Sequence, residues 1–504
     1  MRRRIVIALV CMLAIIPTMS WGQSASAATG ELVFANTTDI STMDPRNATG
    51  TPTAGILAHV YSSLLKTDET GKILPDLAVS YKNINPLTWE FTLNKNIKFH
   101  DGSILTSADV KYTVDTISDP SKKFRLASDF SFMSVEIIDD LRLRITTKQP
   151  FLELPLRLNY MKIIPKAYVE RVGDDEFAKK PIGSGPYTFV ERLKDEKVVL
   201  QAFNGYFGKK PAIKKVTYRI IPEAASRIAA LESGEVQIIG TVATSQVPRL
   251  KGMKNIEVVG SPTTRVMFIG MNLKKANSPL QDVRVRQALN YGVDKDALIS
   301  GILDGYGTKI ASVSTPEYFG YDPSIKPYEY DQKKAKDLLK AAGYPKGIDL
   351  TFSVSSGGLN AYDVVQAISA QLGEIGINCT IVEESNTQQT DKIRAGTVSD
   401  LYFTGIGGPY ANIDLVTKLS FCTGERFSCY SDKVFDDLRV KAASTVDTDE
   451  AKKLLSEVQR YMKDKAPAIF LYQQYGLYAY DKRVANWKAR TDEMILANDA
   501  EIKK

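Results

Sequence analysis

Hydrophobic and polar positions alternate along this chain with two different periods. Residues 31–37 (ELVFANT) and 467–480 (PAIFLYQQYGLYAY) are rich in β-branched and aromatic residues, which predicts a first strand and a pair of strands near the end. Residues 53–67 (TAGILAHVYSSLLKT) instead carry apolar side chains every three to four positions and predict an amphipathic helix. Strand and helix segments alternate in this way without a repeat, so the expected fold class is α/β with several mixed sheets.

Capping residues and glycines indicate where several helices begin and end. Thr106 and Asp109 have the spacing of a capping box, and Gly234 closes a helix that begins at Ala224. The same patterns predict helices at 330–343 and 360–376 and strands at 348–356 and 377–384.

The N-terminal segment has the three parts of a secretory signal peptide. Arg2, Arg3 and Arg4 precede an apolar run at residues 5–19, and SASAA at 24–28 offers small residues for cleavage. We expect cleavage after residue 27 or 28, and therefore a periplasmic protein with a signal peptide at 1–28. Cys11 lies inside the apolar run, so no lipoprotein anchor is expected.

The net charge and the length of the chain after cleavage indicate which partners and how many domains to expect. Removing residues 1–28 takes away three arginines and leaves 476 residues with a formal charge of +4 instead of +7. No dense Lys/Arg block is present, so nucleic acid is not an expected partner. A chain of this length can build two or three domains, each with its own core.

The sequence contains no recognisable catalytic or metal-binding constellation. His59 and His100 are the two histidines, and neither belongs to an HExxH or paired-histidine pattern, so we expect structural roles, no metal site and no cofactor. A GxSxG nucleophile motif is absent. Ser63 and Lys66 form an SxxK, but the SDN and KTG partner motifs of penicillin-binding enzymes are missing. These absences favour a binding protein over an enzyme.

The cysteines suggest one disulfide. Cys422 and Cys429 are separated by a turn-forming TGER segment, and such a short loop suits a disulfide in an oxidising compartment; two free thiols are the alternative. Cys379 lies in the strand-like run INCTIV, where we expect a buried small hydrophobe.

The glycine-rich loop YFTGIGGPYANID at residues 402–414 is not a phosphate-binding loop. No lysine and hydroxyl follow Gly408 as the P-loop pattern requires, and the last glycine of GxGxxG is missing. Its role has to be interpreted from the surrounding chain.

Several stretches resemble the extracytoplasmic solute-binding proteins of ABC transporters, specifically family 5, which includes dipeptide, oligopeptide, glutathione and nickel binders. Residues 61–117 carry PDLA, a strand ending in FHDG, and a helix start LTSADV in the order of that family. Further stretches follow in family order: PIGSGPYTFVE, PEAASRIAALESGEVQII, VRVRQALNYGVDKDALI and FLYQQYGLYAYDKRVANW. The resemblance covers about residues 31 to 490.

The resemblance implies a two-lobe, periplasmic-binding-protein-like fold with a hinge and an extra small α/β domain. Lobe I would combine residues 29–55, 184–260 and 479–504. The extra domain II would span 56–183, and lobe III would span 261–478. Such a protein is the substrate-binding subunit of an ABC importer: its lobes close on a small solute, and the closed form is recognised by the membrane permease. A monomer without enzymatic activity is expected.

The implied ligand site departs from the pattern of dipeptide binders. Gly405 and Gly408 stand where those proteins have a tryptophan and an aspartate, and Ser355 stands where they have an arginine, so both charged anchors for a free dipeptide are missing. Nickel is disfavoured by the shortage of histidine. The expected cleft wall comprises Thr49, Gly50, Thr51, Arg265, Ser355, Ser356, Gly357, Gly358, Gly405, Gly407, Gly408 and Tyr410.

A wall of small residues suits a peptide or peptide-like solute held through its backbone. Arg265 and Arg125 are possible sources of positive charge for an anionic ligand, and a surface position is the alternative for each. A non-peptide organic solute or a chemosensory receptor subunit remains open as an alternative function, and an exported enzyme is a remote one.

Overall fold

One large sheet runs through the molecule. The computed structural model describes residues 30–48, 50–356, 358, 360–408 and 411–503, so the predicted signal peptide and the predicted site residues Thr49, Gly357 and Tyr410 lie outside the described part. Within that part the large sheet has eleven strands in the order β15-β14-β16-β12-β17-β11-β1-β10-β9-β8, with β13 paired to β17.

The strands of the large sheet are β1 (Glu31–Asn36), β8 (Tyr187–Leu193), β9 (Lys197–Ala202), β10 (Lys215–Ile220), β11 (Ile238–Ile239), β12 (Ile256–Met271), β13 (Gly307–Lys309), β14 (Ile348–Ser355), β15 (Ile377–Glu384), β16 (Leu401–Ile406) and β17 (Ala468–Asp481). Smaller sheets contain β2 (Leu65–Thr67), β3 (Ile73–Pro75), β4 (Ala78–Asn85), β5 (Thr88–Leu93), β6 (Met133–Asp139), β7 (Arg142–Thr147), β18 (Val484–Ala485) and β19 (Glu501–Ile502).

The first half of the chain holds α1 (Thr51–Val60), α2 (Ser107–Ser118), α3 (Ala127–Phe130), α4 (Leu154–Tyr160), α5 (Lys166–Val172), α6 (Asp174–Lys179), α7 (Ala224–Glu232) and α8 (Val247–Lys251). The second half holds α9 (Val283–Tyr291), α10 (Lys295–Gly301), α11 (Gln332–Ala341), α12 (Ala361–Glu374), α13 (Asn386–Ala395), α14 (Ile413–Phe421), α15 (Lys433–Ala443) and α16 (Thr448–Lys465). None of the helices in these ranges is long and apolar enough to cross a membrane.

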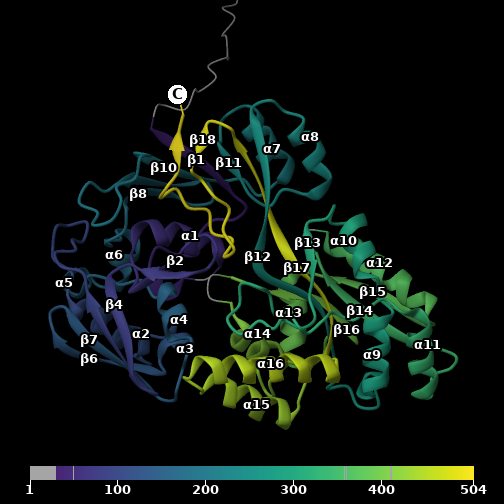
Figure 1. Cartoon of the computed structure of the whole chain (residues 1–504). Coiled ribbons are helices and arrows are strands. Elements are labelled where there is room, and N and C mark those ends of the chain that lie inside the picture. The colour runs from purple at the N-terminus through teal and green to yellow at the C-terminus, as the bar shows by residue number, and fades with distance from the viewer. Residues whose placement is uncertain (1–29, 49, 357, 359, 409–410, 504) are drawn as a thin grey trace, which may run out of the picture.

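The long antiparallel strands β12 and β17 connect the two ends of the large sheet. Figure 1 shows them crossing from the β1–β11 side, at the top, to the β14–β16 side at the lower right. The expectation of a strand pair at 467–480 is wrong, because β17 is one continuous strand that finds a partner along both halves of β12. β12 pairs with β17 up to Pro262–Tyr475 and resumes at Val266–Gln473, so three residues of β12 face a single residue of β17. This bulge lies between the part of the sheet around β1 and β11 and the part around β14 and β16.

A second, separate sheet forms a smaller part of the molecule. Strands β4-β5-β7-β6 pack with α2 and α4 around a core that runs from Leu64 to Ile163, and we call this part the four-stranded unit (residues 64–163). In Figure 1 it lies at the lower left, away from the β14–β16 end of the large sheet. Helices α5 and α6 are not part of that core, because Val169 and Phe177 pack in the cluster that also holds Leu32 and Phe34 of β1.

The helix expected at 53–67 is correct in its first part and wrong in its second. It ends at Val60, and Leu65 already belongs to β2. The GSG turn explains the early end: Gly183 and Gly185 lie so close to the end of α1 that a Cβ at Gly183 would be 2.1 Å from the Val60 carbonyl oxygen. The chain leaves the helix at Tyr61 in an extended conformation. The predicted capping box of α2 is confirmed: the Thr106 side chain accepts from the Asp109 backbone N–H, and the Asp109 side chain accepts from the Thr106 backbone N–H.

The predicted disulfide between Cys422 and Cys429 is not formed. Both cysteines are free thiols and are buried, and the half-buried Cys379 is a free thiol too. Cys422 packs in the cluster of Val266 and Phe268, whereas Cys429 packs in a different cluster with Ile393 and Tyr402. The two side chains therefore pack in different hydrophobic clusters, which sequence spacing alone does not reveal.

Candidate functional site

A cleft of about 460 Å³ lies along the crossing strands β12 and β17, in the size range of about 300–1,000 Å³ that is typical of small-molecule sites. It is bounded by the end of β1, the first turns of α1, the bulge of β12, the middle of β17 and the C-terminal segment. The described residues that line it are Ala35, Asn36, Thr37, Gly50, Thr51, Pro52, Gly55, Tyr218, Gly240, Thr241, Arg265, Gly407, Gln474, Tyr475, Gly476, Leu477, Tyr478, Glu493 and Ile495.

Four of the predicted site residues lie in this cleft wall: Gly50, Thr51, Arg265 and Gly407. They come from three separate stretches of the chain: the start of α1, the bulge of β12 and the segment after β16. Gly407 packs directly against the backbone of Arg265, because a Cβ there would be 2.7 Å from the Arg265 Cα.

The other glycines of the loop at 402–414 support the wall without lining it. The backbone N–H of Gly408 donates to the Thr264 hydroxyl at 3.2 Å, and that hydroxyl donates to the Gly408 carbonyl oxygen at 2.9 Å. Gly405 lies in β16, where a Cβ would be 2.3 Å from the Met267 sulfur. Gly405 therefore allows a close approach of β16 to β12, whereas Gly408 supplies a backbone with φ of +129° that favours glycine.

Ser355 and Ser356 are not among the described residues that line the cleft. Ser355 ends β14, and the Ser356 N–H donates to the Glu384 carbonyl oxygen at 2.8 Å, which extends the pairing of β14 with β15. Gly358 is exposed in the turn that leads to α12. The structure thus places this predicted wall segment beyond the cleft of about 460 Å³.

Arg265 and Glu493 are the charged groups among the described lining residues, and they form an ion pair. Arg265 donates from Nη2 to Glu493 Oε2 at 2.8 Å and from Nε to Oε1 at 3.3 Å. Burial lowers the pKa of the Arg265 guanidinium, but the Glu493 carboxylate outweighs burial and raises it above its ordinary value. The β12 bulge turns Arg265 toward the cleft. Glu493 reaches it from a backbone with φ of +63°, a left-handed conformation that is costly for a residue with a side chain.

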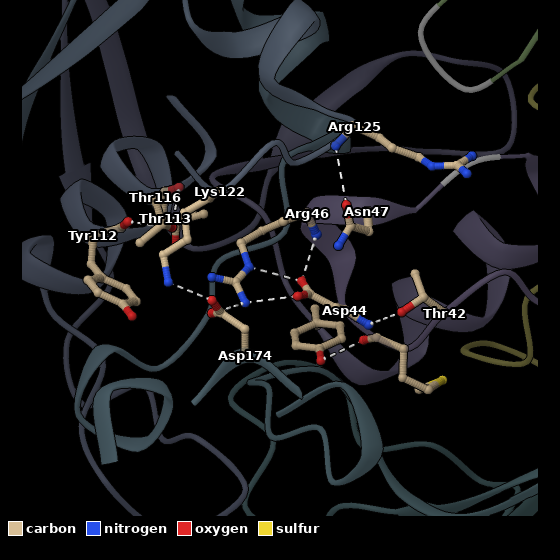
Figure 2. A network of polar contacts seen from close by, with 12 residues as sticks. Thr42, Asp44, Arg46, Asn47, Tyr112, Thr113, Thr116, Lys122, Arg125 and Asp174 are labelled. Atoms are coloured by element: carbon tan, nitrogen blue, oxygen red, sulfur yellow. Dashed lines mark hydrogen bonds and ion pairs between the residues drawn. The ribbon is translucent and has the colours of Figure 1, made fainter. Parts of the chain in front are cut away.

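A buried charge cluster holds the segment that carries β1 into α1. Arg46 is fully buried and donates to Asp44 and to Asp174, each at 2.8 Å, while its guanidinium lies 4.2 Å from the Phe124 ring centroid. Figure 2 shows this network, with Lys122 completing the neutralisation of Asp174. Since removal of one partner from a buried ion pair is strongly destabilising, the cluster fixes where α1 begins.

Arg125 does not reach the cleft. Its backbone N–H donates to the Asn47 side chain at 3.2 Å, and its side chain is exposed and points away from the Arg46 network (Figure 2). The alternative of a surface position is therefore correct for Arg125, whereas Arg265 lines the cleft as an ion-paired residue.

The two histidines have structural partners. The Ala497 N–H donates to His59 Nε2 at 2.9 Å, and His59 Nδ1–H donates to the Gly55 carbonyl oxygen at 2.8 Å, so α1 is tied to the C-terminal segment. Burial lowers the pKa of His59 to about 4. His100 donates from Nε2 to the Gly185 carbonyl oxygen at 3.1 Å, which holds the GSG turn. Across the described ranges, no group of three or more His, Cys, Asp or Glu side chains is arranged to hold a metal ion.

The SxxK pattern does not form a Ser–Lys pair in space. The Ser63 hydroxyl is buried, donates to the Asn159 carbonyl oxygen at 2.8 Å and accepts from Lys162 instead of Lys66. Lys66 pairs with Asp76 at 3.5 Å. Ser63 is thus a packed structural hydroxyl.

Sequence reasoning missed the part of the wall contributed by Asn36, Glu493 and the middle of β17. Asn36 ends a recognisable strand, so its place beside Gly50 could have been inferred. Residues 473–478 (QQYGLY) interrupt an otherwise apolar strand with polar side chains and a glycine. Such an interruption could have predicted that this part of the strand faces a cleft. Nothing in the sequence pairs Glu493 with Arg265.

Comparison with known proteins agrees with this architecture. The family model of bacterial extracellular solute-binding proteins, family 5, middle part, matches residues 72–426. The chain belongs to family 5 of the extracellular solute-binding proteins. This family consists of substrate-binding proteins, not enzymes, that act outside the cytoplasm.

Members with names or solved structures match over nearly the whole chain. The glutathione-binding protein GsiB of Pectobacterium atrosepticum is 28% identical over 487 residues, which is 94% of each chain. The periplasmic binding protein DppA of Helicobacter pylori, solved with the peptide STSA, is 28% identical with a TM-score of 0.81 over 94% of this chain and 98% of that one. The binding protein AgaA of A. tumefaciens R10, solved with agropinic acid, is 26% identical with a TM-score of 0.78 over 94% and 99%.

Proposed function

We propose that this family 5 protein is the periplasmic substrate-binding subunit of an ABC importer and captures a peptide or peptide-like solute in the cleft between β12, β17 and α1. The observation that carries the proposal is the cleft itself: it lies at the β12 bulge, where two parts of the sheet meet and can hinge. Relatives named for glutathione and for a bound peptide support the ligand class. The implied partner is the permease of the importer, and the protein acts as a monomer without enzymatic activity.

The expected division into lobes belongs to the same proposal. Residues 29–55, 184–260 and 479–504 would form lobe I, residues 56–183 domain II, and residues 261–478 lobe III. The packing of α5 and α6 against the β1 core suggests that they would move with lobe I when the cleft closes.

The chemistry of the wall suits a peptide. Backbone amides of a peptide need donors and acceptors, and the cleft offers Asn36, Thr37, Thr51, Thr241, Gln474 and Tyr475 beside glycines that let a ligand approach the backbone closely. Because the charged pair in the wall is neutral overall, a ligand with a large net charge would be left without compensation.

The test is binding by the purified mature protein, residues 29–504. Thermal shift and native mass spectrometry with glutathione and a panel of di- to pentapeptides should show a raised Tm and a one-to-one complex. An exposed-surface variant, Arg125→Gln, should bind as the wild type does. Lack of any shift or complex across the panel would overturn the peptide proposal.

A non-peptide organic solute is the second candidate, and the relative solved with agropinic acid favours it. Mass spectrometry of small molecules that co-purify with the native protein distinguishes the two, because it reports the mass of the natural ligand. A receptor subunit that binds without transport would give the same binding data and is separated by uptake of the ligand in cells.

A further inference from the structure

The N-terminus of α1 opens into the cleft without a side-chain cap. Its N-cap is Gly50, which has no side chain to accept from the first turn, and Pro52 has no N–H. The N–H of Thr51 makes no hydrogen bond to the described residues. The ten-residue helix adds the partial positive charge of its dipole at this end. Uncapped helix ends of this kind favour an anion.

A second, independent donor at the same cleft has no partner. Asn36 is 7% exposed and lines the cleft at the end of β1, and its side-chain Nδ2 makes no hydrogen bond in the described structure. A buried amide N–H without an acceptor is costly, so such a group usually has a partner that satisfies it. An acceptor from a bound solute would supply it.

Arg265 of β12 is the third hydrogen-bond donor at this cleft. Its Nε and Nη2 contact Glu493, while Nη1 makes no hydrogen bond to the described residues. Glu493 holds the guanidinium against the wall, with the free edge left for a ligand, so it is a positioning residue. The pair is neutral, so only the helix end and one open guanidinium edge attract an anion. One helix end and one guanidinium edge match a group with a single negative charge, such as a carboxylate.

We propose that the N-terminus of α1, the Asn36 amide and the free edge of Arg265 form a subsite for one carboxylate of the captured solute. This inference rests on the proposed function and sharpens it, because it requires a solute with a free carboxylate. A peptide with an unblocked C-terminus and glutathione both satisfy that requirement, whereas a C-terminal amide or ester does not.

The experiment compares acids with their neutral counterparts by calorimetry on the mature protein. The probes are trialanine and trialanine amide, and glutathione and its glycine monoethyl ester. We expect the free acid of at least one pair to bind about 10-fold more tightly or better, the contribution of a charge-assisted hydrogen bond. Inorganic sulfate at the same concentration should not compete.

The variants separate the subsite from the fold. Arg265→Gln combined with Glu493→Gln removes both charges, so neither is left unpaired, and should abolish the preference for the acid. Asn36→Asp places a like charge beside the carboxylate and should reverse the preference. Arg125→Gln is the matched control, and circular dichroism with thermal unfolding reports whether each variant folds.

The possible outcomes distinguish failure of the carboxylate subsite from failure of the peptide-binding proposal. Equal binding of acid and neutral forms by the wild type would overturn the subsite and leave the peptide-binding proposal standing. Retention of the acid preference by a folded Arg265→Gln/Glu493→Gln variant would also overturn it. If no probe binds at all, the peptide proposal fails and the subsite fails with it. Competition by sulfate would show a general anion site in place of a carboxylate subsite.

Discussion

Glu153 is a carboxyl group enclosed where the four-stranded unit meets α14, α15 and α16. It is the residue before α4, and it shares a small cavity with Phe319, Asp414 and Leu455. Both carboxylate oxygens are buried and have no hydrogen-bond partner among the described residues. The same cavity is lined by Leu152 beside α4 and by Ala442 of α15.

The surroundings disfavour the charged form. Burial and, to a lesser extent, the Asp414 carboxylate raise the pKa of Glu153, the Arg157 guanidinium lowers it in part, and the result is a pKa of about 8. Asp414 is itself neutralised by an ion pair with Arg439, and Arg157 pairs with Asp129 at 3.4 Å. Glu153 is therefore protonated in the folded protein at neutral pH.

The consequence for stability follows from linkage. The pKa of Glu153 is higher in the folded than in the unfolded chain, so its contribution to stability is fully present below pH 4.5 and is lost as the pH rises to about 8. Because one pH unit corresponds to about 1.4 kcal/mol for one proton, the full loss is on the order of 5 kcal/mol. The Glu153→Gln variant has no carboxyl group to ionise at this position, so it should not show this pH-dependent loss of stability.

Urea unfolding of both proteins at pH 5, 6, 7 and 8 measures this directly. We expect the variant to gain stability over the wild type as pH rises, with a slope of up to about 1.4 kcal/mol per pH unit. Asp414→Asn should reduce the gain, because it removes the neighbouring charge. Glu170→Gln, on the exposed face of α5, is the control. A difference between wild type and Glu153→Gln that stays constant from pH 5 to pH 8 would refute the reasoning.

Three further predictions concern packing, titration and thiols. Gly183→Ala should lower the free energy of unfolding by about 3 kcal/mol or more, because the new Cβ would lie 2.1 Å from the Val60 carbonyl oxygen, whereas Gly373→Ala in α12 meets nothing within 4 Å and should be neutral or stabilising by thermal unfolding. The folded pKa of His59 is about 4, below the unfolded value of 6.5, so stability should fall by about 3 kcal/mol as the pH drops from 6.5 to 4; a His59→Gln variant that loses as much stability as the wild type would contradict this. Titration of the unfolded mature protein with a thiol reagent should find three free thiols, and a single thiol would show that a disulfide forms after all.

Secondary structure could be predicted from the sequence where it depends on residues close together in the chain. The capping box at Thr106, the first strand and helix α12 depend on neighbours within a few residues, so their patterns survive in the fold. The family resemblance led to Gly50 and Gly407, which do lie at the cleft.

The remaining features depend on contacts between distant residues. Arg265 meets Glu493 only because a bulge in β12 faces the C-terminal segment, and no local pattern encodes that meeting. α1 stops at Val60 because a glycine turn more than a hundred residues later lies against it. The disulfide prediction failed for the same reason, since spacing sets the distance between two cysteines along the chain and the surrounding cores set where they point.

The central claim is that the cleft between β12, β17 and α1 is where the solute binds. Calorimetric titration of the mature protein with glutathione and trialanine, in the wild type and in Thr51→Trp, tests it most directly, because an indole at the start of α1 would fill the cleft. The account predicts one-to-one binding by the wild type, loss of binding by Thr51→Trp, and unchanged binding by Tyr362→Trp on the exposed side of α12. Undiminished binding by a folded Thr51→Trp variant would contradict it.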